Sequence, residues 1–256
     1  MPTWDSEQYL KFEKERTQPS IDLVSKIQID SPKNIVDVGC GPGNSTAVLK
    51  SHWPSANISA FDNSSEMLQH ARKTDPTIDW FQADITSWIP DKKYDLIFSN
   101  AVFQWVPDHE IIFPKFVSFL NDGGALAVQM PAHFDSPLHE LLVKVSENEK
   151  WKHITSKARK RLEMKNPEFY YDFLAPIVSK IDIWKTEYYH EVDSVHSIIE
   201  WFRGTGMRPF LEALNNESDK LDFEDELFRE YEKVYKKRIN KKVLMPFRRF
   251  FFVGYK

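Results

Sequence analysis

The feature that most constrains the fold is a glycine-rich turn between a short apolar strand and a helix. An apolar run at 35–38 ends in Gly39-Cys-Gly41-Pro-Gly43, and a helix-like segment covers 44–51. Glycines at this spacing let the backbone turn tightly, and they let a ligand approach where any Cβ would collide. A strand, a glycine turn and a helix in this order predict the first unit of an α/β sheet that holds a ligand at the turn.

Further strands and helices alternate along the first half of the chain. A helix capped by Ser64 or Ser65 runs to Arg72, and a second one covers 111–120. This alternation predicts a mostly parallel sheet with helices on both faces. The predicted strands lie at 35–38, 58–61, 78–82, 94–99 and 125–130.

The pattern changes after Pro131. Segments 138–175 and 195–240 predict helices, whereas 181–192 and 247–255 predict two late strands, so we expect one antiparallel edge strand and a helical cap insertion. No repeat or flexible linker divides the chain, and we expect one domain over 1–256. Its expected parts are a core at 30–133, 178–192 and 245–256, an N-terminal lid at 1–29, and a helical cap at 134–177 and 193–244.

Composition narrows the partners and the compartment. The formal net charge of −4 argues against a protein that binds nucleic acid through bulk basic charge. Cys40 is the single cysteine, which forbids an internal disulfide and fits a reducing compartment. The charged N-terminus is unlike a signal peptide, and no apolar run approaches the length of a membrane span. We therefore expect a cytoplasmic protein that is a monomer or weak homodimer, with no membrane partner.

Aspartates at the strand ends indicate a nucleoside ligand. Asp62 ends the second strand, 19 residues after Gly43, where a carboxylate can accept hydrogen bonds from both hydroxyls of a ribose. Asp84 follows the third strand, where it can accept from an adenine amino group. Asp37 precedes the turn, and it would repel the pyrophosphate of a nicotinamide dinucleotide at the helix N-terminus. An amino-acid tail with a free ammonium suits such a site better, although a nicotinamide oxidoreductase remains an alternative.

The run from Asp37 to Thr46 (Asp-Val-Gly-Cys-Gly-Pro-Gly-Asn-Ser-Thr) resembles the first motif of class I S-adenosylmethionine-dependent methyltransferases. The whole chain resembles the bacterial trans-aconitate 2-methyltransferase family. The resemblance implies a Rossmann-like class I methyltransferase sheet, S-adenosyl-L-methionine as the cofactor, and methyl transfer to a carboxylate oxygen of a small polycarboxylate. The segments that carry it lie at 4–19, 96–109, 126–131, 182–190, 205–209 and 246–253.

The candidate cofactor-binding residues lie around the turn, at the strand ends and in the N-terminal segment. Arg16 is either a contact from a segment that folds over the cofactor or a solvated arginine. Trp105 either faces the sulfonium or packs under a loop. The set is Arg16, Asp37, Gly39, Gly41, Gly43, Asn44, Asp62, Asn63, Met67, Asp84, Ile85, Asn100 and Trp105.

The candidate substrate-binding residues follow from the acid that the resemblance implies. A carboxylate is already ionised at neutral pH, so no catalytic base and no metal is expected, and the enzyme acts by positioning. Arginine has the planar geometry that forks onto carboxylates, and of the adjacent Arg248 and Arg249 only one can face a given side of a strand. The set is Gln104, Trp105, His133, Tyr171, Tyr189, Arg208 and Arg248.

The segment Gly206-Met-Arg-Pro-Phe210 departs from the family pattern, in which we expect Leu and Trp at the second and fifth places, and residues 150–167 are rich in lysine and arginine. These departures bear on the exact substrate more than on the reaction. Two other functions remain open. One is a class I methyltransferase that acts on another small acid or a carrier-bound acyl group. The other is a non-catalytic cofactor-binding module.

Overall fold

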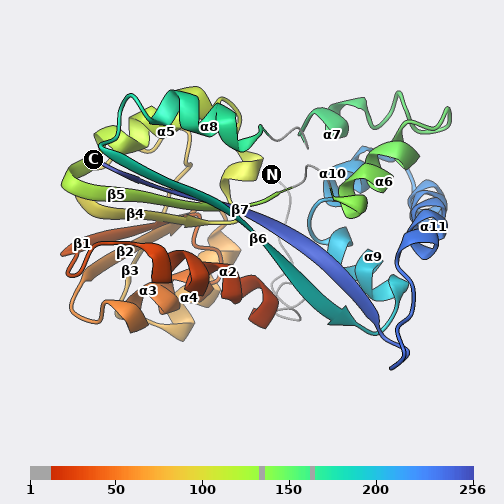
Figure 1. Ribbon diagram of the computed structural model, residues 1–256, viewed down its shortest axis with the longest axis horizontal. Coiled ribbons are helices and arrows are strands. Elements are labelled where there is room, and N and C mark those ends of the chain that lie inside the picture. Colours follow the sequence, from red (N-terminus) through yellow and green to blue (C-terminus); the bar gives the residue numbers. More distant parts are fainter. Residues whose placement is uncertain (1–12, 133–135, 162–164) are drawn as a thin grey trace. The chain divides into compact units, whose positions relative to one another are not determined.

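The protein forms a seven-stranded sheet with the strand order β3-β2-β1-β4-β5-β7-β6, seen in a computed structural model that describes residues 13–132, 136–161 and 165–256 (Figure 1). Neighbours among the first five strands are parallel. The strands are β1 (Asn34–Val38), β2 (Asn57–Asp62), β3 (Asp79–Gln82), β4 (Tyr94–Asn100), β5 (Leu120–Pro131), β6 (Lys180–Val192) and β7 (Val243–Tyr255).

β7 runs against its neighbour β5. Lys256 N–H donates to the Gly124 carbonyl, and Ala132 N–H donates to the Arg248 carbonyl. Residue numbers therefore increase along one strand as they decrease along the other, which makes the pair antiparallel. The fold class expected from the sequence, a mostly parallel sheet that closes with an antiparallel strand, is confirmed. The central strands are buried on both faces, which explains why they read as continuous apolar runs.

The chain divides into two compact units, and some strands contribute to both. The first unit comprises Met1–Met130, Lys165–Lys185 and Arg249–Lys256, and the second comprises Pro131–Met164 and Thr186–Arg248. Strands β6 and β7 pass from one unit to the other within their own length. None of the helices in the described part of the chain is both long and apolar enough to span a membrane.

Helices of the first unit flank its sheet. Ser64 caps α4, because its hydroxyl accepts a hydrogen bond from the Met67 N–H, as its position before the first apolar turn predicts. Helix α2 was not expected from the sequence, and it contains Pro19 in its interior. The helices are α2 (Glu13–Lys26), α3 (Asn44–His52), α4 (Ser65–Thr74), the 3₁₀ helix η1 (Phe103–Trp105), α5 (His109–Ser118) and α8 (Pro167–Leu174).

The second unit is mostly helical and has its own core. The Tyr231 hydroxyl donates to the Leu138 carbonyl at 2.7 Å, and the Trp151 ring meets Phe223 edge to face. Ion pairs from Lys144 to Glu230 and from Lys150 to Asp222 flank this core. Its helices are α6 (Pro137–Ser146), α7 (Ser156–Arg161), α9 (Val195–Arg203), α10 (Arg208–Ala213) and α11 (Glu217–Val234).

Candidate functional site

The glycine turn after β1 is tied to the end of β2. The N–H groups of Gly39 and Cys40 both donate to the Phe61 carbonyl, at 2.8 and 3.0 Å. The backbone φ angles are +69° at Gly39, +54° at Gly41 and +104° at Gly43, all in the left-handed region that favours glycine. The turn expected from the sequence is therefore the observed one.

The glycines of this turn meet different surroundings. A Cβ at Gly39 would lie 2.4 Å from a methyl carbon of Val102, so the loop after β4 packs directly on that glycine. A Cβ at Gly43 would lie 3.0 Å from the Trp80 ring. At Gly41 nothing lies within 4 Å of the Cβ position. Gly41 is thus the glycine whose open side a ligand can approach.

Asp62 fastens the turn at the carboxyl end of β2. One of its carboxylate oxygens accepts from the Gly41 N–H at 2.9 Å, and the other accepts from the Ser64 N–H at 2.8 Å. Burial raises the pKa of this carboxyl above its ordinary value, although the bonds from Ser64 and Gly41 oppose the shift. Each carboxylate oxygen accepts more than one hydrogen bond, so both remain able to bind ribose hydroxyls.

Asp37 lies beneath the turn rather than on its surface. The residue is 0% exposed, and its Oδ2 accepts from the Ser45 hydroxyl and the Thr46 hydroxyl at 2.6 Å each. Its Oδ1 has no hydrogen-bond partner within the described residues. Burial raises the pKa of this carboxyl from 3.8 to about 6, against the lowering effect of the two hydroxyls. The carboxylate therefore holds the first turn of α3 from inside the protein.

The raised pKa of Asp37 makes stability depend on pH between about 4 and 6. Because the folded state binds this proton more tightly than the unfolded state, the stabilisation is complete below the unfolded pKa and is lost as pH rises through 6. Asp37→Asn is expected to remove that loss. Relative to the parent, the variant should gain roughly 3 kcal/mol in unfolding free energy between pH 4 and pH 7.5.

Urea unfolding of both proteins across this pH range measures the difference. Asp95→Asn is a suitable control, because hydrogen bonds to the Asp95 carboxyl outweigh its burial and lower its pKa below 3.8. Its titration therefore falls below this pH range, and the variant's curve should run nearly parallel to the parent's. Parallel pH curves for Asp37→Asn and the parent would contradict the expectation.

The remaining cofactor candidates of the first three strands lie at the same edge of the sheet. Asp84 follows β3, and Oδ1 of its carboxylate accepts from the backbone N–H and hydroxyl of Thr86, which lowers its pKa. Ile85 follows it directly. β3, β2 and β1 are consecutive and parallel, so Asp84, Asp62 and Gly41 form a row along their carboxyl ends. Three further candidates adjoin this row: Asn63 before α4, Met67 buried on α4, and Asn44 at the start of α3.

The loop after β4 is held in a strained form. Ala101 and Asp108 both have positive φ, at 59° and 55°, which costs a non-glycine residue about 1–2 kcal/mol. The Ala101 N–H donates to the Gln129 carbonyl at 2.9 Å, and its own carbonyl accepts from the Gln104 side chain at 2.6 Å. Strain of this kind is maintained only where the surroundings enforce it, and it gathers at functional sites. Asn100, another cofactor candidate, immediately precedes the loop.

His109 fixes the 3₁₀ helix within this loop, and sequence reasoning gave it no role. Its Nε2 lies 2.8 Å from the Phe103 carbonyl, which can only accept, so Nε2 carries the proton. Its Nδ1 then accepts from the Tyr170 hydroxyl, also at 2.8 Å. Burial lowers the pKa of the imidazole, which keeps it neutral. The ring thereby positions Gln104 and the half-exposed Trp105, two candidates for contact with the reactants.

The acid-binding candidates fall in different places. Arg248 Nε donates to the Glu187 carboxylate at 2.6 Å, and the Tyr189 hydroxyl donates to the same carboxylate, so the structure brings these three side chains together in the second unit. Arg208 also lies in that unit, where its Nε donates to Glu212 at 2.8 Å. Tyr171 lies in the first unit with 54% of its surface exposed. The Arg16 side chain and His133 lie outside the described residues.

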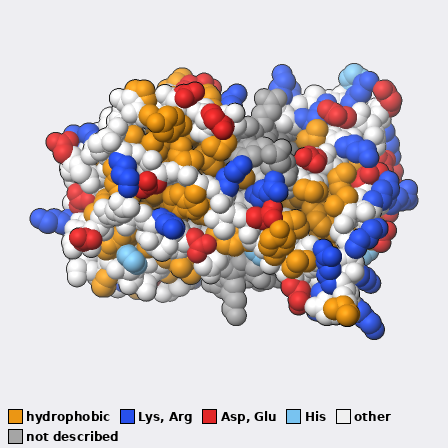
Figure 2. Space-filling model, in the orientation of Figure 1, with side chains coloured by type: hydrophobic (Ala, Val, Ile, Leu, Met, Phe, Trp, Pro, Cys, Tyr) orange, Lys and Arg blue, Asp and Glu red, His pale blue; other side chains and the backbone are white. Residues whose placement is uncertain are grey.

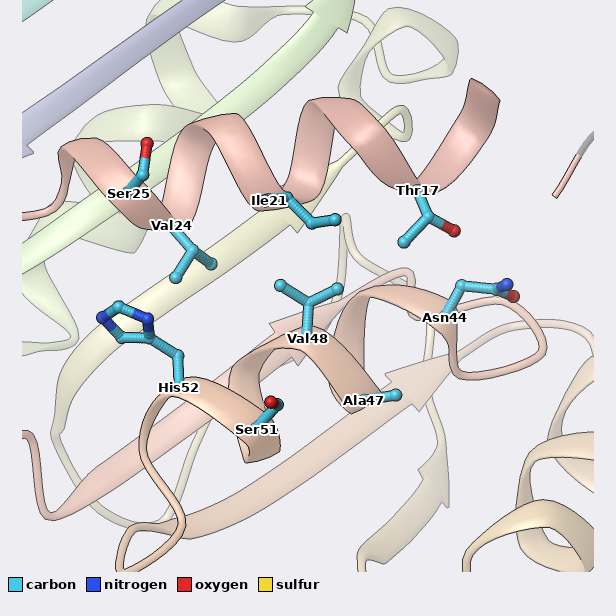
Figure 3. Close-up of a pocket in the computed structure, with 9 residues that line it drawn as sticks. All are labelled: Thr17, Ile21, Val24, Ser25, Asn44, Ala47, Val48, Ser51 and His52. Carbon is cyan, nitrogen blue, oxygen red and sulfur yellow. The ribbon is translucent and has the colours of Figure 1, made fainter. Parts of the chain in front are cut away.

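A groove of about 530 Å³ lies between α2 and α3 (Figure 3). Ile21 and Val24 of α2 face Val48 of α3 across it. Among the candidates that the structure describes, only Asn44 lines it, so the groove meets the row of strand-end residues at Asn44 and is otherwise formed by other residues. Its lining residues are Thr17, Ile21, Val24, Ser25, Asn44, Ala47, Val48, Ser51 and His52.

Comparisons with known proteins agree with this geometry. Residues 35–124 match a family described as methyltransferase domain. A protein named trans-aconitate 2-methyltransferase from Rhodopseudomonas palustris (strain BisB5) is 42% identical over 257 residues, covering 100% of each chain. One of the same name from Azoarcus sp. (strain BH72) is 45% identical over 214 residues, covering 84% of each.

A solved structure shares the fold. Phosphoethanolamine N-methyltransferase 2 of Haemonchus contortus, in complex with S-adenosyl-L-methionine, superposes with a TM-score of 0.57 at 15% identity. The match covers 93% of this chain and 52% of that one.

Proposed function

This chain belongs to the trans-aconitate 2-methyltransferase family, and from that membership we propose that it methylates a carboxylate of trans-aconitate or a similar small polycarboxylate. The observation that carries the proposal is the identity of 42% over the whole length of a relative with that name. S-adenosyl-L-methionine is the methyl donor of the class to which the domain belongs.

The residues at the strand ends fit this cofactor. Gly41 offers an open backbone where a side chain would otherwise stand, and Asp62 offers carboxylate oxygens for ribose hydroxyls. Asp84 stands one strand further out, where it can accept from an adenine amino group. When bound, the cofactor supplies a methyl group on a positively charged sulfur.

The reaction asks the protein for positioning rather than for acid or base chemistry. The carboxylate of the acid is ionised at neutral pH and carries no proton to remove. The protein's task is to hold the attacking oxygen in line with the methyl group. Such positioning lowers the activation free energy by roughly 7–11 kcal/mol in well-oriented systems. The loop carrying Gln104 and Trp105 suits this task, because His109 and the Gln129 backbone hold it in one form.

The anionic acid also requires cationic or hydrogen-bonding partners. We assign this role to Arg208 and Arg248, whose guanidinium groups fork onto carboxylates. Both already lie against glutamates, Glu212 and Glu187, which hold the long side chains in one direction. Charged side chains of both signs are interspersed on the face shown in Figure 2, so that face offers no broad basic surface for a polyanion.

Methyl transfer from labelled S-adenosylmethionine to a panel of acids tests the proposal. The panel contains trans-aconitate, cis-aconitate, isocitrate, citrate and a fatty acid, and we expect a strong preference for trans-aconitate with a monomethyl ester as product. Preference for another acid would correct the substrate. Cofactor binding without transfer to any acid would contradict the proposal and indicate another acceptor class or a binding module.

Arg208→Ala is expected to raise KM for the acid roughly ten- to a hundredfold, because a charge-assisted bond to a carboxylate is worth about 1.5–3 kcal/mol. The dissociation constant of the cofactor should stay within about twofold. Arg229→Ala is the matched control, since Arg229 makes the same kind of ion pair four residues along a helix but is 68% exposed. Unchanged acid kinetics in Arg208→Ala would remove Arg208 from the acid site.

A further inference from the structure

Gln129 is a buried amide that the protein itself leaves unsatisfied. The residue is 0% exposed on β5, yet neither Nε2 nor Oε1 of its side chain has a hydrogen-bond partner among the described residues. Its backbone carbonyl is hydrogen-bonded, since it accepts from the Ala101 N–H at 2.9 Å. The unsatisfied part is therefore the carboxamide alone.

Such a group is costly unless something else binds it. Burying an amide without a partner destabilises the folded protein, because the group gives up its hydrogen bonds to water. The neighbours of Gln129 along β5, such as Val128 and Met130, are fully buried and apolar, as the strand requires. A methionine would fill the same space without that cost, so the amide points to a ligand rather than to packing.

Gln129 lies near the carboxyl end of β5, at the same edge of the sheet as the cofactor row but beyond β4. It pairs in register with Asn100 on the parallel strand β4, so both side chains stand on the same face at the carboxyl ends of their strands. Asn100 Oδ1 and Gln104 Oε1 are likewise buried without a partner among the described residues. The row for the cofactor runs along β3, β2 and β1, and β4 separates that row from β5.

We propose that Gln129 is a specificity-determining residue whose Nε2 donates a hydrogen bond to the carboxylate that receives the methyl group. This assignment rests on the proposed function and deepens it. An ionised carboxylate only accepts hydrogen bonds, and Nε2 carries two unused hydrogens.

A neutral donor suits this reaction better than a cation at the reacting carboxylate. During transfer a bond forms between the carboxylate oxygen and the methyl carbon, the bond from carbon to sulfur breaks, and its electron pair stays on sulfur. No proton moves, and the negative charge of the carboxylate disappears. A full positive charge beside it would stabilise the reactant more than the transition state, whereas an amide orients the oxygen with a smaller penalty of this kind.

Gln129→Met separates this role from a structural one. If the amide had a structural role, replacing it would destabilise the protein. Replacing an amide without hydrogen-bond partners should not. We expect the free variant to melt at the same temperature as the parent or higher, with the cofactor dissociation constant within about twofold. KM for trans-aconitate should rise roughly ten- to a hundredfold, as for the loss of one charge-assisted bond.

Two further variants sharpen the comparison. Gln129→Glu keeps the shape but places a carboxylate opposite the acid, so it should weaken acid binding more than Gln129→Met does. Tyr235→Phe is the matched control, because the Tyr235 hydroxyl is also buried without a partner in the described part of the chain. It should leave acid kinetics unchanged and should not lower the melting temperature.

Acid binding is also measured directly, by titrating trans-aconitate into protein loaded with S-adenosylhomocysteine. If the parent binds the acid and Gln129→Met binds it more weakly, the assignment is supported even without turnover. Normal acid binding and lower stability in Gln129→Met would overturn it and leave the proposed function standing. A parent protein that neither binds nor methylates any acid would overturn both.

Discussion

Gly39→Ala is expected to lose roughly 2–4 kcal/mol in the free energy of unfolding, a large share of the stability of a typical domain. The added Cβ would stand 2.4 Å from Val102, where something must shift, and the residue would keep a φ of +69° that alanine disfavours. Chemical denaturation monitored by tryptophan fluorescence measures the loss.

Two controls separate the causes at Gly39. Gly39→Ala combined with Val102→Ala should recover the part of the loss that comes from the collision and keep the part that comes from the backbone. Gly41→Ala has a similar φ but open space around its Cβ, so it should lose only about 1 kcal/mol in the free energy of unfolding. Relative to that smaller loss of stability, it should weaken cofactor binding more than Gly39→Ala does. Equal stability losses at the two glycines would show that Val102 does not press on Gly39.

Asp62→Ala is expected to weaken cofactor binding at least a hundredfold, because two charge-assisted bonds to ribose hydroxyls are worth roughly 3–6 kcal/mol together. The same change frees the N–H groups of Gly41 and Ser64, so the glycine turn keeps only its backbone bonds to Phe61 of β2. Isothermal titration with S-adenosylhomocysteine, which has the same ribose, measures the affinity without turnover.

Asp62→Asn tests whether the full carboxylate is needed. It keeps one acceptor oxygen but places an amide donor opposite an N–H group, so it should lower affinity nearly as much as alanine. Ser64→Ala is a control for disturbance of α4, since it removes the hydroxyl that caps this helix and leaves the Ser64 N–H bond to Asp62 in place. Its affinity should stay within about threefold of the parent. An Asp62→Ala protein that is folded and binds the cofactor normally would exclude Asp62 as the ribose ligand.

The sequence carries enough information for the sheet and for the row of cofactor candidates. Buried parallel strands read as apolar runs, and aspartates at their ends can be placed because carboxyl ends of neighbouring parallel strands share one edge. The sequence could not show which glycine of the turn is packed against another residue and which is open to a ligand. Whether Gly39 faces Val102 or open space depends on the loop after β4, which is a tertiary contact between distant segments.

That loop escaped prediction for a related reason. Ala101 has no intrinsic preference for positive φ, and it adopts 59° because Gln104 and Gln129 bond its carbonyl and its N–H. His109 likewise gains its role from Tyr170, which is 61 residues away in the chain. Gln129 left a visible signal, a single polar residue within the apolar run of β5, and such a break in a buried strand indicates a site as well as an imperfect strand.

The route of the chain between its units has a consequence for engineering. The backbone passes from one unit to the other four times, after residues 130, 164, 185 and 248. No single cut releases either unit as a continuous polypeptide, and deleting residues 131–164 or 186–248 alone would remove only part of the second. Exchange of that unit between relatives therefore requires two coordinated replacements, of residues 131–164 and of residues 186–248. We expect recombinants with one crossover point to be far less soluble than those that replace both segments together.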